Sequence, residues 1–227
     1  MRTMKESKKR RTLAVTFGVA MGFFAGIATS VLATERSTDE DAAIPADAAV
    51  FSRSQADWSL AWWQWNLSFS PQLSPALDAS GARCTAGQEG DVWFLAGPGI
   101  DSHTSRDCTI PFGKTLLVPL AAQSGSMPGR SAKWCPDAVR NTSTSIDSVR
   151  NLRLEVDGRP IANLASHRQK TDGCTEMAAA NVPLDMMFLA ATDGYYVMLK
   201  PLDRGKHLIQ FSANDGSVQV RYSITVK

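Results

Sequence analysis

The stretch VQVRYSITV, residues 218–226, carries the clearest structural pattern in the chain. Its apolar and polar residues alternate strictly, and a period of two is typical of a β-strand with one buried and one solvated face. Two strand-like stretches precede it, YYVMLKPL (195–202) and KHLIQFSA (206–213), and turn residues at 203–205 and 214–216 separate the three. Consecutive short strands at this spacing predict a mainly β fold, an antiparallel β-sandwich of the jelly-roll or immunoglobulin-like kind.

The middle of the chain continues the β pattern. GDVWFLAG (90–97) and CTIPFGKTLLVPLAAQ (108–123) are apolar runs bounded by turn residues, and NLRLEVDGRPIANL (151–164) predicts two strands around an Asp-Gly turn. Pro119 predicts a strand end or a sheet edge, because proline has no N–H to donate to a neighbouring strand. A short helix is expected over residues 136–141.

A tryptophan-rich segment, ADWSLAWWQWNLSF (56–69), lies upstream and holds four of the six tryptophans. Ser54 and Asp57 form a capping box, in which a hydroxyl accepts an early backbone N–H and a carboxylate lies three residues on. We therefore predict a helix over residues 55–67. Its apolar residues occupy two sides, which favours a helix that packs on the sheet and is partly covered from outside.

Two other roles stay open for these tryptophans. Exposed rings would form a platform for a sugar or another ligand, and the candidate ligand-contacting residues are Trp58, Trp62, Trp63 and Trp65. A helix lying on a membrane surface is the second alternative. Such helices carry Lys or Arg on their polar face, and none occurs between Arg53 and Arg83.

The N-terminus has the pattern of an export signal. MRTMKESKKRR (1–11) is basic, and the next 22 residues are uncharged, mostly apolar and end in small residues. We predict a signal peptide over residues 1–33 with cleavage after Ala33, and an exported, periplasmic or extracellular location. An uncleaved anchor stays open, since about 20 apolar residues can span a bilayer, and Arg10-Arg11 resembles a twin-arginine signal.

The rest of the chain divides by composition. Residues 34–50 are acidic and rich in alanine, which predicts a flexible spacer, and residues 51–227 are expected to form one β-sandwich domain. Beyond Ala33 the chain carries 18 basic and 21 acidic residues, a net charge of −3. That balance argues against a nucleic-acid partner, which requires a basic face. Any membrane contact would come through an uncleaved signal segment.

All four cysteines follow the signal segment. An even number in an exported protein predicts disulfides, and four cysteines allow three pairings. We favour Cys84–Cys108 and Cys135–Cys174, because each pair brackets a strand-rich segment. A four-thiolate zinc site is disfavoured, since no two cysteines lie as close as in a C-x-x-C pair.

Chemistry-bearing residues are sparse. Asp101, His103 and Asp107 bring two carboxylates and an imidazole into one polar stretch, a candidate divalent-metal site, although an ordinary polar loop is the favoured interpretation. No cofactor is expected. Acids for glycan hydrolysis would come from a set of four residues, Glu89, Asp91, Glu155 and Asp157.

Several motifs taken together resemble those of a family of bacterial exported proteins. They are WSLAWWQW (58–65), the Asp78, Gly81, Cys84 and Gly87-Gln88 series, VWFLAG (92–97), CTIPFGK (108–114) and GYYVMLKPLDRGKHLIQF (194–211). The likeness covers nearly all of residues 54–227. The family is known only as hypothetical secreted proteins. The resemblance therefore implies a compact secreted fold with a WWQW helix and a jelly-roll or immunoglobulin-like C-terminus, and it supplies no catalytic residues.

These patterns favour one class of function. We expect an exported cell-envelope or extracellular protein that acts as a non-enzymatic binding module for a polysaccharide or an envelope protein, because no catalytic motif such as G-x-S-x-G occurs. A secreted hydrolase, acting on glycans through Asp and Glu residues, is the first alternative. A metal or cofactor carrier is the second.

Overall fold

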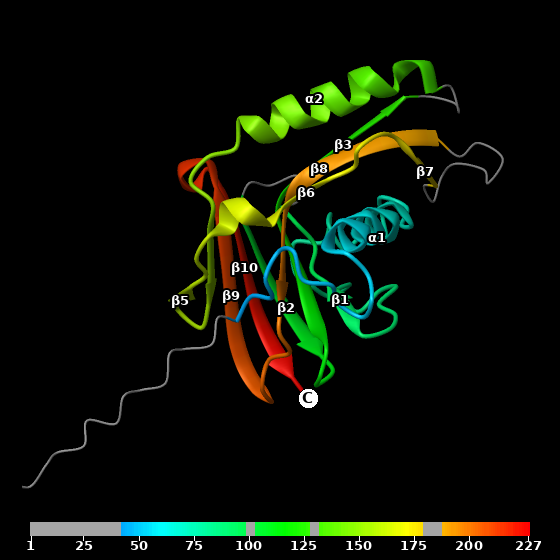
Figure 1. The fold of residues 1–227 in the computed structure, drawn as a ribbon. Coiled ribbons are helices and arrows are strands. Elements are labelled where there is room, and N and C mark those ends of the chain that lie inside the picture. The colour runs from blue at the N-terminus through cyan, green and yellow to red at the C-terminus, as the bar shows by residue number, and fades with distance from the viewer. Residues whose placement is uncertain (1–41, 99–102, 128–131, 179–187) are drawn as a thin grey trace, which may run out of the picture. The chain divides into compact units, whose positions relative to one another are not determined.

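The computed structural model describes residues 42–98, 103–127, 132–178 and 188–227 (Figure 1). Asp101 and the predicted signal peptide with its cleavage site at Ala33 lie outside the described residues. The elements in chain order are α1 (Gln55–Leu67), β1 (Val92–Phe94), β2 (His103–Ile110), β3 (Thr115–Met127), η1 (Ala132–Trp134), α2 (Cys135–Asp147), β4 (Arg153–Val156), β5 (Arg159–Pro160), η2 (Leu164–His167), β6 (Arg168–Lys170), β7 (Thr175–Met177), β8 (Phe188–Leu199), β9 (Gly205–Ala213), η4 (Asn214–Gly216) and β10 (Val218–Val226).

Two mixed β-sheets make up most of this fold. The first has the strand order β1-β3-β8-β6, with β7 also paired to β8, and the second has the order β2-β10-β9-β4-β5. The pairs β1–β3 and β2–β10 are parallel, and the other pairs are antiparallel. The prediction of a mainly β fold is confirmed, but that of purely antiparallel sheets is wrong. β2 pairs with a strand far along the chain, so no hairpin fixes its direction.

The main apolar core lies between the two sheets. The alternation predicted for residues 218–226 is confirmed, because Val220, Tyr222 and Ile224 of β10 are buried in this core while Gln219 and Arg221 point outward. Inward residues of β2, β3, β4, β8 and β9 complete the same cluster. The two sheets therefore lie face to face, as in a sandwich.

The first sheet is covered on its other face as well. In Figure 1, α2 lies over β3 and β8, and α1 lies on the opposite side of these strands. A Cβ on Gly125 of β3 would lie 3.1 Å from the Ala138 carbonyl oxygen of α2, so glycine permits this close approach. Covering on both faces explains why β8 is buried over most of its length.

Several local predictions differ from the structure. The helix expected over 136–141 extends over Cys135–Asp147. Pro119 lies inside β3 rather than at its end, at a bulge in the pairing with β8, where the ladder tolerates a missing N–H. Residues 203–205 do not close a hairpin, because β8 belongs to the first sheet and β9 to the second.

The expected spacer over residues 34–50 is wrong for its second half. Ala43 forms a bridge with Leu199, and the Ile44 N–H donates to the Met198 carbonyl over 2.8 Å. Val50 is buried as well. Composition suggested a solvated linker, but these apolar side chains cover the end of β8.

Two disulfides hold irregular segments to the sheets. They are Cys84–Cys108 and Cys135–Cys174, the pairing that the sequence favours. The first joins the loop before β1 to β2, and the second joins the start of α2 to the segment before β7. Disulfides of this kind are compatible with an oxidising, extracytoplasmic compartment.

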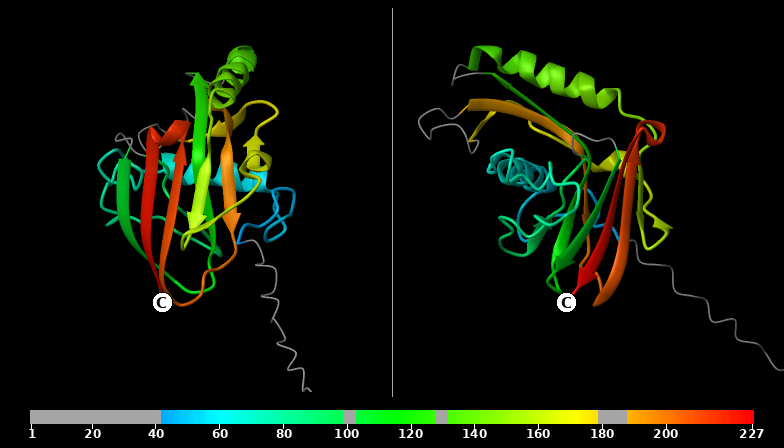
Figure 2. Two further views of the ribbon diagram at one scale, coloured as in Figure 1. Left: turned by 90° about the vertical axis from the view of Figure 1, so that its left-hand side faces the viewer. Right: turned by 180° about the vertical axis from the view of Figure 1, so that it is seen from behind.

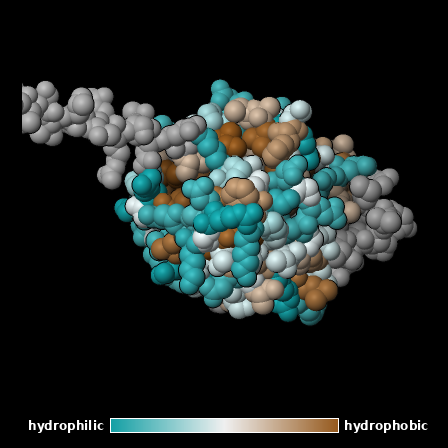
Figure 3. Space-filling view, turned by 90° about the horizontal axis from the view of Figure 1, so that it is seen from below, coloured by the Kyte–Doolittle hydropathy of each residue, from teal (hydrophilic) through white to brown (hydrophobic). Residues whose placement is uncertain are grey.

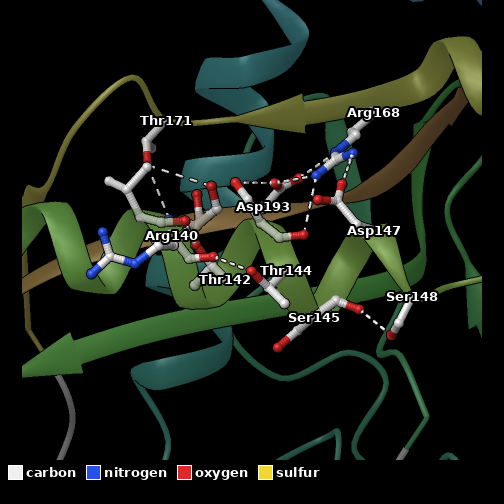
Figure 4. A network of polar contacts seen from close by, with 12 residues as sticks. Arg140, Thr142, Thr144, Ser145, Asp147, Ser148, Arg168, Thr171 and Asp193 are labelled. Atoms are coloured by element: carbon white, nitrogen blue, oxygen red, sulfur yellow. Dashed lines mark hydrogen bonds and ion pairs between the residues drawn. The ribbon is translucent and has the colours of Figure 1, made fainter.

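A buried ion pair ties α2 to the first sheet (Figure 4). Arg168 of β6 donates two hydrogen bonds to the Asp193 carboxylate of β8, over 2.9 and 2.7 Å, and a third to Asp147 over 2.7 Å. The Ser143 hydroxyl of α2 donates to Asp193 as well, over 3.0 Å. The hydrogen bonds to Asp193 are the largest of the effects that hold the pKa of Arg168 above its usual value.

Candidate functional site

The tryptophans of α1 lie mostly in the interior. Ser54 caps the helix as predicted, accepting a hydrogen bond from the Asp57 backbone N–H. Trp62, Trp63 and Trp65 are 3%, 9% and 6% exposed, so the packed-helix interpretation fits and an exposed platform made of these rings does not. Trp58 is half-buried and lies under the Arg53 guanidinium.

The indole N–H groups of these tryptophans meet acceptors inside the protein. Trp62 donates to the Leu95 carbonyl over 2.8 Å, and Trp63 donates to the Tyr196 hydroxyl over 2.7 Å. Burial raises the pKa of Tyr196, so its phenol stays neutral. These contacts anchor α1 on the first sheet. No helix among the described residues combines the length and apolarity needed to cross a membrane.

The two candidate metal residues that the structure describes lie on a strand and not in a loop. His103 and Asp107 are both exposed and lie on the same face of β2. Residues four apart on a strand are separated by about 13 Å, too far to share one ion without help from other segments. Within the described ranges, no group of three or more His, Cys, Asp and Glu side chains is placed to hold a metal.

The candidate hydrolytic acids fall into separate places. Glu89 and Asp91 precede β1 of the first sheet, whereas Glu155 and Asp157 belong to β4 and its turn in the second. The Asp157 carboxylate accepts hydrogen bonds from the Leu208 N–H and from His207 Nδ1, each over 2.7 Å. This carboxylate therefore holds the turn against β9. Of the four acids, only Glu155 lines the concavity on the outer face of the second sheet.

The outer face of the second sheet carries polar side chains from several strands. In the left view of Figure 2, β2, β10, β9 and β4 lie side by side in the foreground. Strand register places outward residues of the four strands in two rows, Ser105–Arg221–Gln210–Glu155 and His103–Gln219–Ser212–Arg153. Neighbours within a row are about 5 Å apart, so their polar groups form a regular array.

Two concavities lie on this face. The upper one has a volume of about 470 Å³ and is lined by both rows. The lower one, of about 440 Å³, is lined by residues 107–109 and 206–207 with residues 223–225. The two follow one another along β2 and β10, over about 20 Å from residue 103 to residue 109. We call this surface the polar track.

Most polar side chains that line the upper concavity form no interaction within the described part of the protein. Those that form no hydrogen bond or ion pair with any other described residue are Ser105, Arg153, Glu155, Gln210, Ser212, Gln219 and Arg221. Arg106 behaves differently. Arg106, only 1% exposed, donates to the carbonyls of Ala76, Asp78 and Gly97. The polar groups of the seven side chains named above are therefore available to a ligand.

One histidine borders the lower end of the track. Burial alone lowers the pKa of His207, but the hydrogen bonds to the Asp157 carboxylate and the Asp203 carbonyl outweigh it and leave the pKa above its usual value. The imidazole is thereby fixed between the β4–β5 turn and the segment before β9.

Several large hydrophobic side chains among the described residues are exposed. The large hydrophobic residues that are at least 44% exposed are Phe51, Leu73, Leu77, Phe112 and Trp134. Seen from below, hydrophobic residues form separate groups among hydrophilic ones (Figure 3).

Most residues of the polar track carry no local signal in the sequence beyond strand alternation. Gln219 and Arg221 are the polar positions of the alternating stretch 218–226, and Arg153 is an outward position of the strand before the Asp-Gly turn. Alternation marks such residues as solvated but does not say which strands are neighbours. Comparisons with protein-family models, with curated proteins and with solved structures find no match to this chain.

Proposed function

We propose that this chain is an exported cell-envelope or extracellular protein that binds a polysaccharide along the polar track. The observation that carries the proposal is the alignment of the two concavities along β2 and β10. A track about 20 Å long suits an extended polymer better than one small molecule. A protein partner is the alternative that the experiment below separates.

The chemistry of the track suits sugar hydroxyls. Amide, hydroxyl and guanidinium groups supply donors and acceptors at about 5 Å intervals across the strands. Because these groups form no hydrogen bond or ion pair with other described residues, binding breaks no internal interaction. The strand backbone is already ordered, so the conformational cost of binding is confined to the side chains, about 0.5–1.5 kcal/mol for each one that is immobilised.

We also propose immunoglobulin-like connectivity for the sandwich that carries the track. Three features support it: β3 and β4 lie in different sheets, β8 and β9 do so too, and β2 runs parallel to the last strand. These match the B–C and E–F crossings of such domains. An experimental structure with a different order of strands would contradict this connectivity.

A pair of matched double variants tests the binding role. Gln210→Ala with Gln219→Ala removes two amides from the track, and Gln72→Ala with Gln123→Ala removes two exposed amides elsewhere. Native gels containing soluble polysaccharides, acidic and neutral, measure retardation of each purified protein. We expect the affinity of the track variant, derived from its retardation, to fall at least about tenfold, the equivalent of 1.4 kcal/mol. The control should have the affinity of the wild type.

Three outcomes would contradict the proposal. The first is that none of the polymers retards the wild type. The second is that the two double variants bind equally well. The third is that the protein releases new reducing ends from a polymer that it binds. The last outcome would favour the hydrolase alternative. If the protein captures a protein partner and the track variant still binds that partner, the binding site lies outside the polar track.

A further inference from the structure

We infer that the polymer bound by the polar track is an acidic polysaccharide whose carboxylates are spaced along the chain, as in a polyuronate. This inference rests on the proposed function and adds the chemistry of the ligand. Its basis is the arrangement of three charged side chains in the upper concavity, Arg153, Arg221 and Glu155.

The two guanidinium groups are held apart by the sheet. Arg221 lies on β10 and Arg153 on β4, with β9 between them, and the register offsets them by two residues. These positions are about 12 Å apart. Strand side chains stand roughly perpendicular to the sheet, so the two guanidinium groups point outward without meeting each other. Two separated guanidinium groups suit a ligand that offers successive anions rather than a single one.

Neither the net charge of the domain nor an ion pair neutralises these two arginines. Residues 42–227 contain 17 basic and 17 acidic residues, so the background is neutral. In the upper concavity two guanidiniums face one carboxylate, and none of the three forms an ion pair with a described residue. Unpaired cations at a partly enclosed surface attract carboxylates more strongly than cations that already have partners.

The outward side chains of the track favour an acidic glycan over a neutral one. No Trp, Tyr or Phe points outward from the described part of this face, whereas neutral sugars are commonly held by stacking on such rings. Recognition therefore falls to the arginines and to the amides between them. Gln210 lies directly between Arg221 and Glu155 in its row and can hydrogen-bond the sugar between two carboxylates.

Glu155 should disfavour polymers that carry a high density of negative charge. It lies in the row of Arg221 and two residues from Arg153, so a polymer with a charge at every position meets a like charge here. A polymer with one carboxylate per sugar can place an uncharged hydroxyl against Glu155 instead. We therefore expect preference for a polyuronate over a densely sulfated chain or DNA.

The test uses the purified protein and three polymers: polygalacturonate, neutral dextran and dextran sulfate. We expect polygalacturonate to bind best, in a salt-sensitive manner. Arg153→Gln with Arg221→Gln should weaken it at least about tenfold, since a charged hydrogen bond contributes about 1.5–3 kcal/mol. Arg140→Gln, an exposed arginine on α2, is the matched control and should bind as the wild type.

A second comparison tests the role of Glu155. Glu155→Gln should raise the affinity for dextran sulfate, and Glu89→Gln, an exposed glutamate outside the track, should not. No change with Glu155→Gln would overturn the role of Glu155 in disfavouring such polymers.

The inference and the proposed function fail in different ways. Equal binding of dextran and polygalacturonate, with no loss in the double arginine variant, would overturn the acidic ligand. The proposed function would survive that result if the glutamine variant still weakened binding. If none of the polymers binds the wild-type protein, both fail.

Discussion

Replacing Arg168 by methionine should expose how strongly the fold depends on its buried ion pair. The Asp193 side chain is 1% exposed and receives two hydrogen bonds from Arg168, while Arg168 itself is 27% exposed. Methionine keeps the length and apolar stem of the side chain and removes the charge. The Asp193 carboxylate then retains the Ser143 hydroxyl but loses its cation (Figure 4).

The size of the loss follows from this geometry. Removing one partner of a buried pair costs about 3–5 kcal/mol, because the other charge stays buried without compensation. For a domain of this size the melting temperature falls by about 2–4 °C per kcal/mol, so a decrease of roughly 10 °C is expected. Arg168→Met with Asp193→Asn removes both charges and should recover more than half of the lost stability.

Urea unfolding with both disulfides intact measures these differences. Arg140→Met is the matched control. Arg140 pairs with Asp137 on the surface of α2, and such exposed pairs contribute at most about 1 kcal/mol. The reasoning is refuted if Arg168→Met costs less than about 1 kcal/mol, or if the double variant is no more stable than Arg168→Met alone.

Three further predictions concern other parts of the fold. Replacing Cys84 and Cys108 by alanine should lower the unfolding free energy by about 3.5 kcal/mol through loop-closure entropy, measured in urea. Gly194→Ala should cost about 1–3 kcal/mol in the same assay, because the new Cβ would lie 2.6 Å from the backbone oxygen of Ala121. Since the pKa of His207 is raised by folding, the stability that it contributes is complete below its unfolded pKa of about 6.5 and disappears as the pH rises through the folded pKa. The advantage of wild type over His207→Asn should therefore shrink as the pH rises above about 6.5.

Each of these predictions has an outcome that contradicts it. Wild-type stability after loss of the Cys84–Cys108 bridge would mean that the loop before β1 is held by packing alone. Gly173→Ala, where nothing lies within 4 Å of the new Cβ, is the control for Gly194→Ala and should be nearly neutral. An advantage over His207→Asn that grows with pH would reverse the sign of the linkage.

The elements that periodicity describes well are those with one clear face. Residues 218–226 alternate without exception, and β10 has those bounds. The capping box at Ser54 and Asp57 located the start of α1, because the capping hydrogen bonds are local. The disulfide pairs were inferred from the segments that they bracket, and the structure joins the same cysteines.

The arrangement of the strands is not contained in these local patterns. The residues at 203–205 have hairpin composition, yet the chain passes there from one sheet to the other, because β9 buries its apolar face against the opposite sheet. The parallel pairing of β2 with β10 is a contact between distant segments. Arg221 and Arg153 come onto one face through the pairing of β9 with both β10 and β4. The pairing of β2 with β10 adds Ser105 to the same face.

The most direct test of the central claim is to map a ligand onto the backbone amides by NMR. A galacturonate oligosaccharide is titrated into the ¹⁵N-labelled protein, and the shift changes are followed residue by residue. We predict that the largest changes fall on residues 103–109 and 219–225, which form most of β2 and most of β10. Changes that centre on α1 or α2, or a spectrum that does not change at millimolar ligand, would contradict the account.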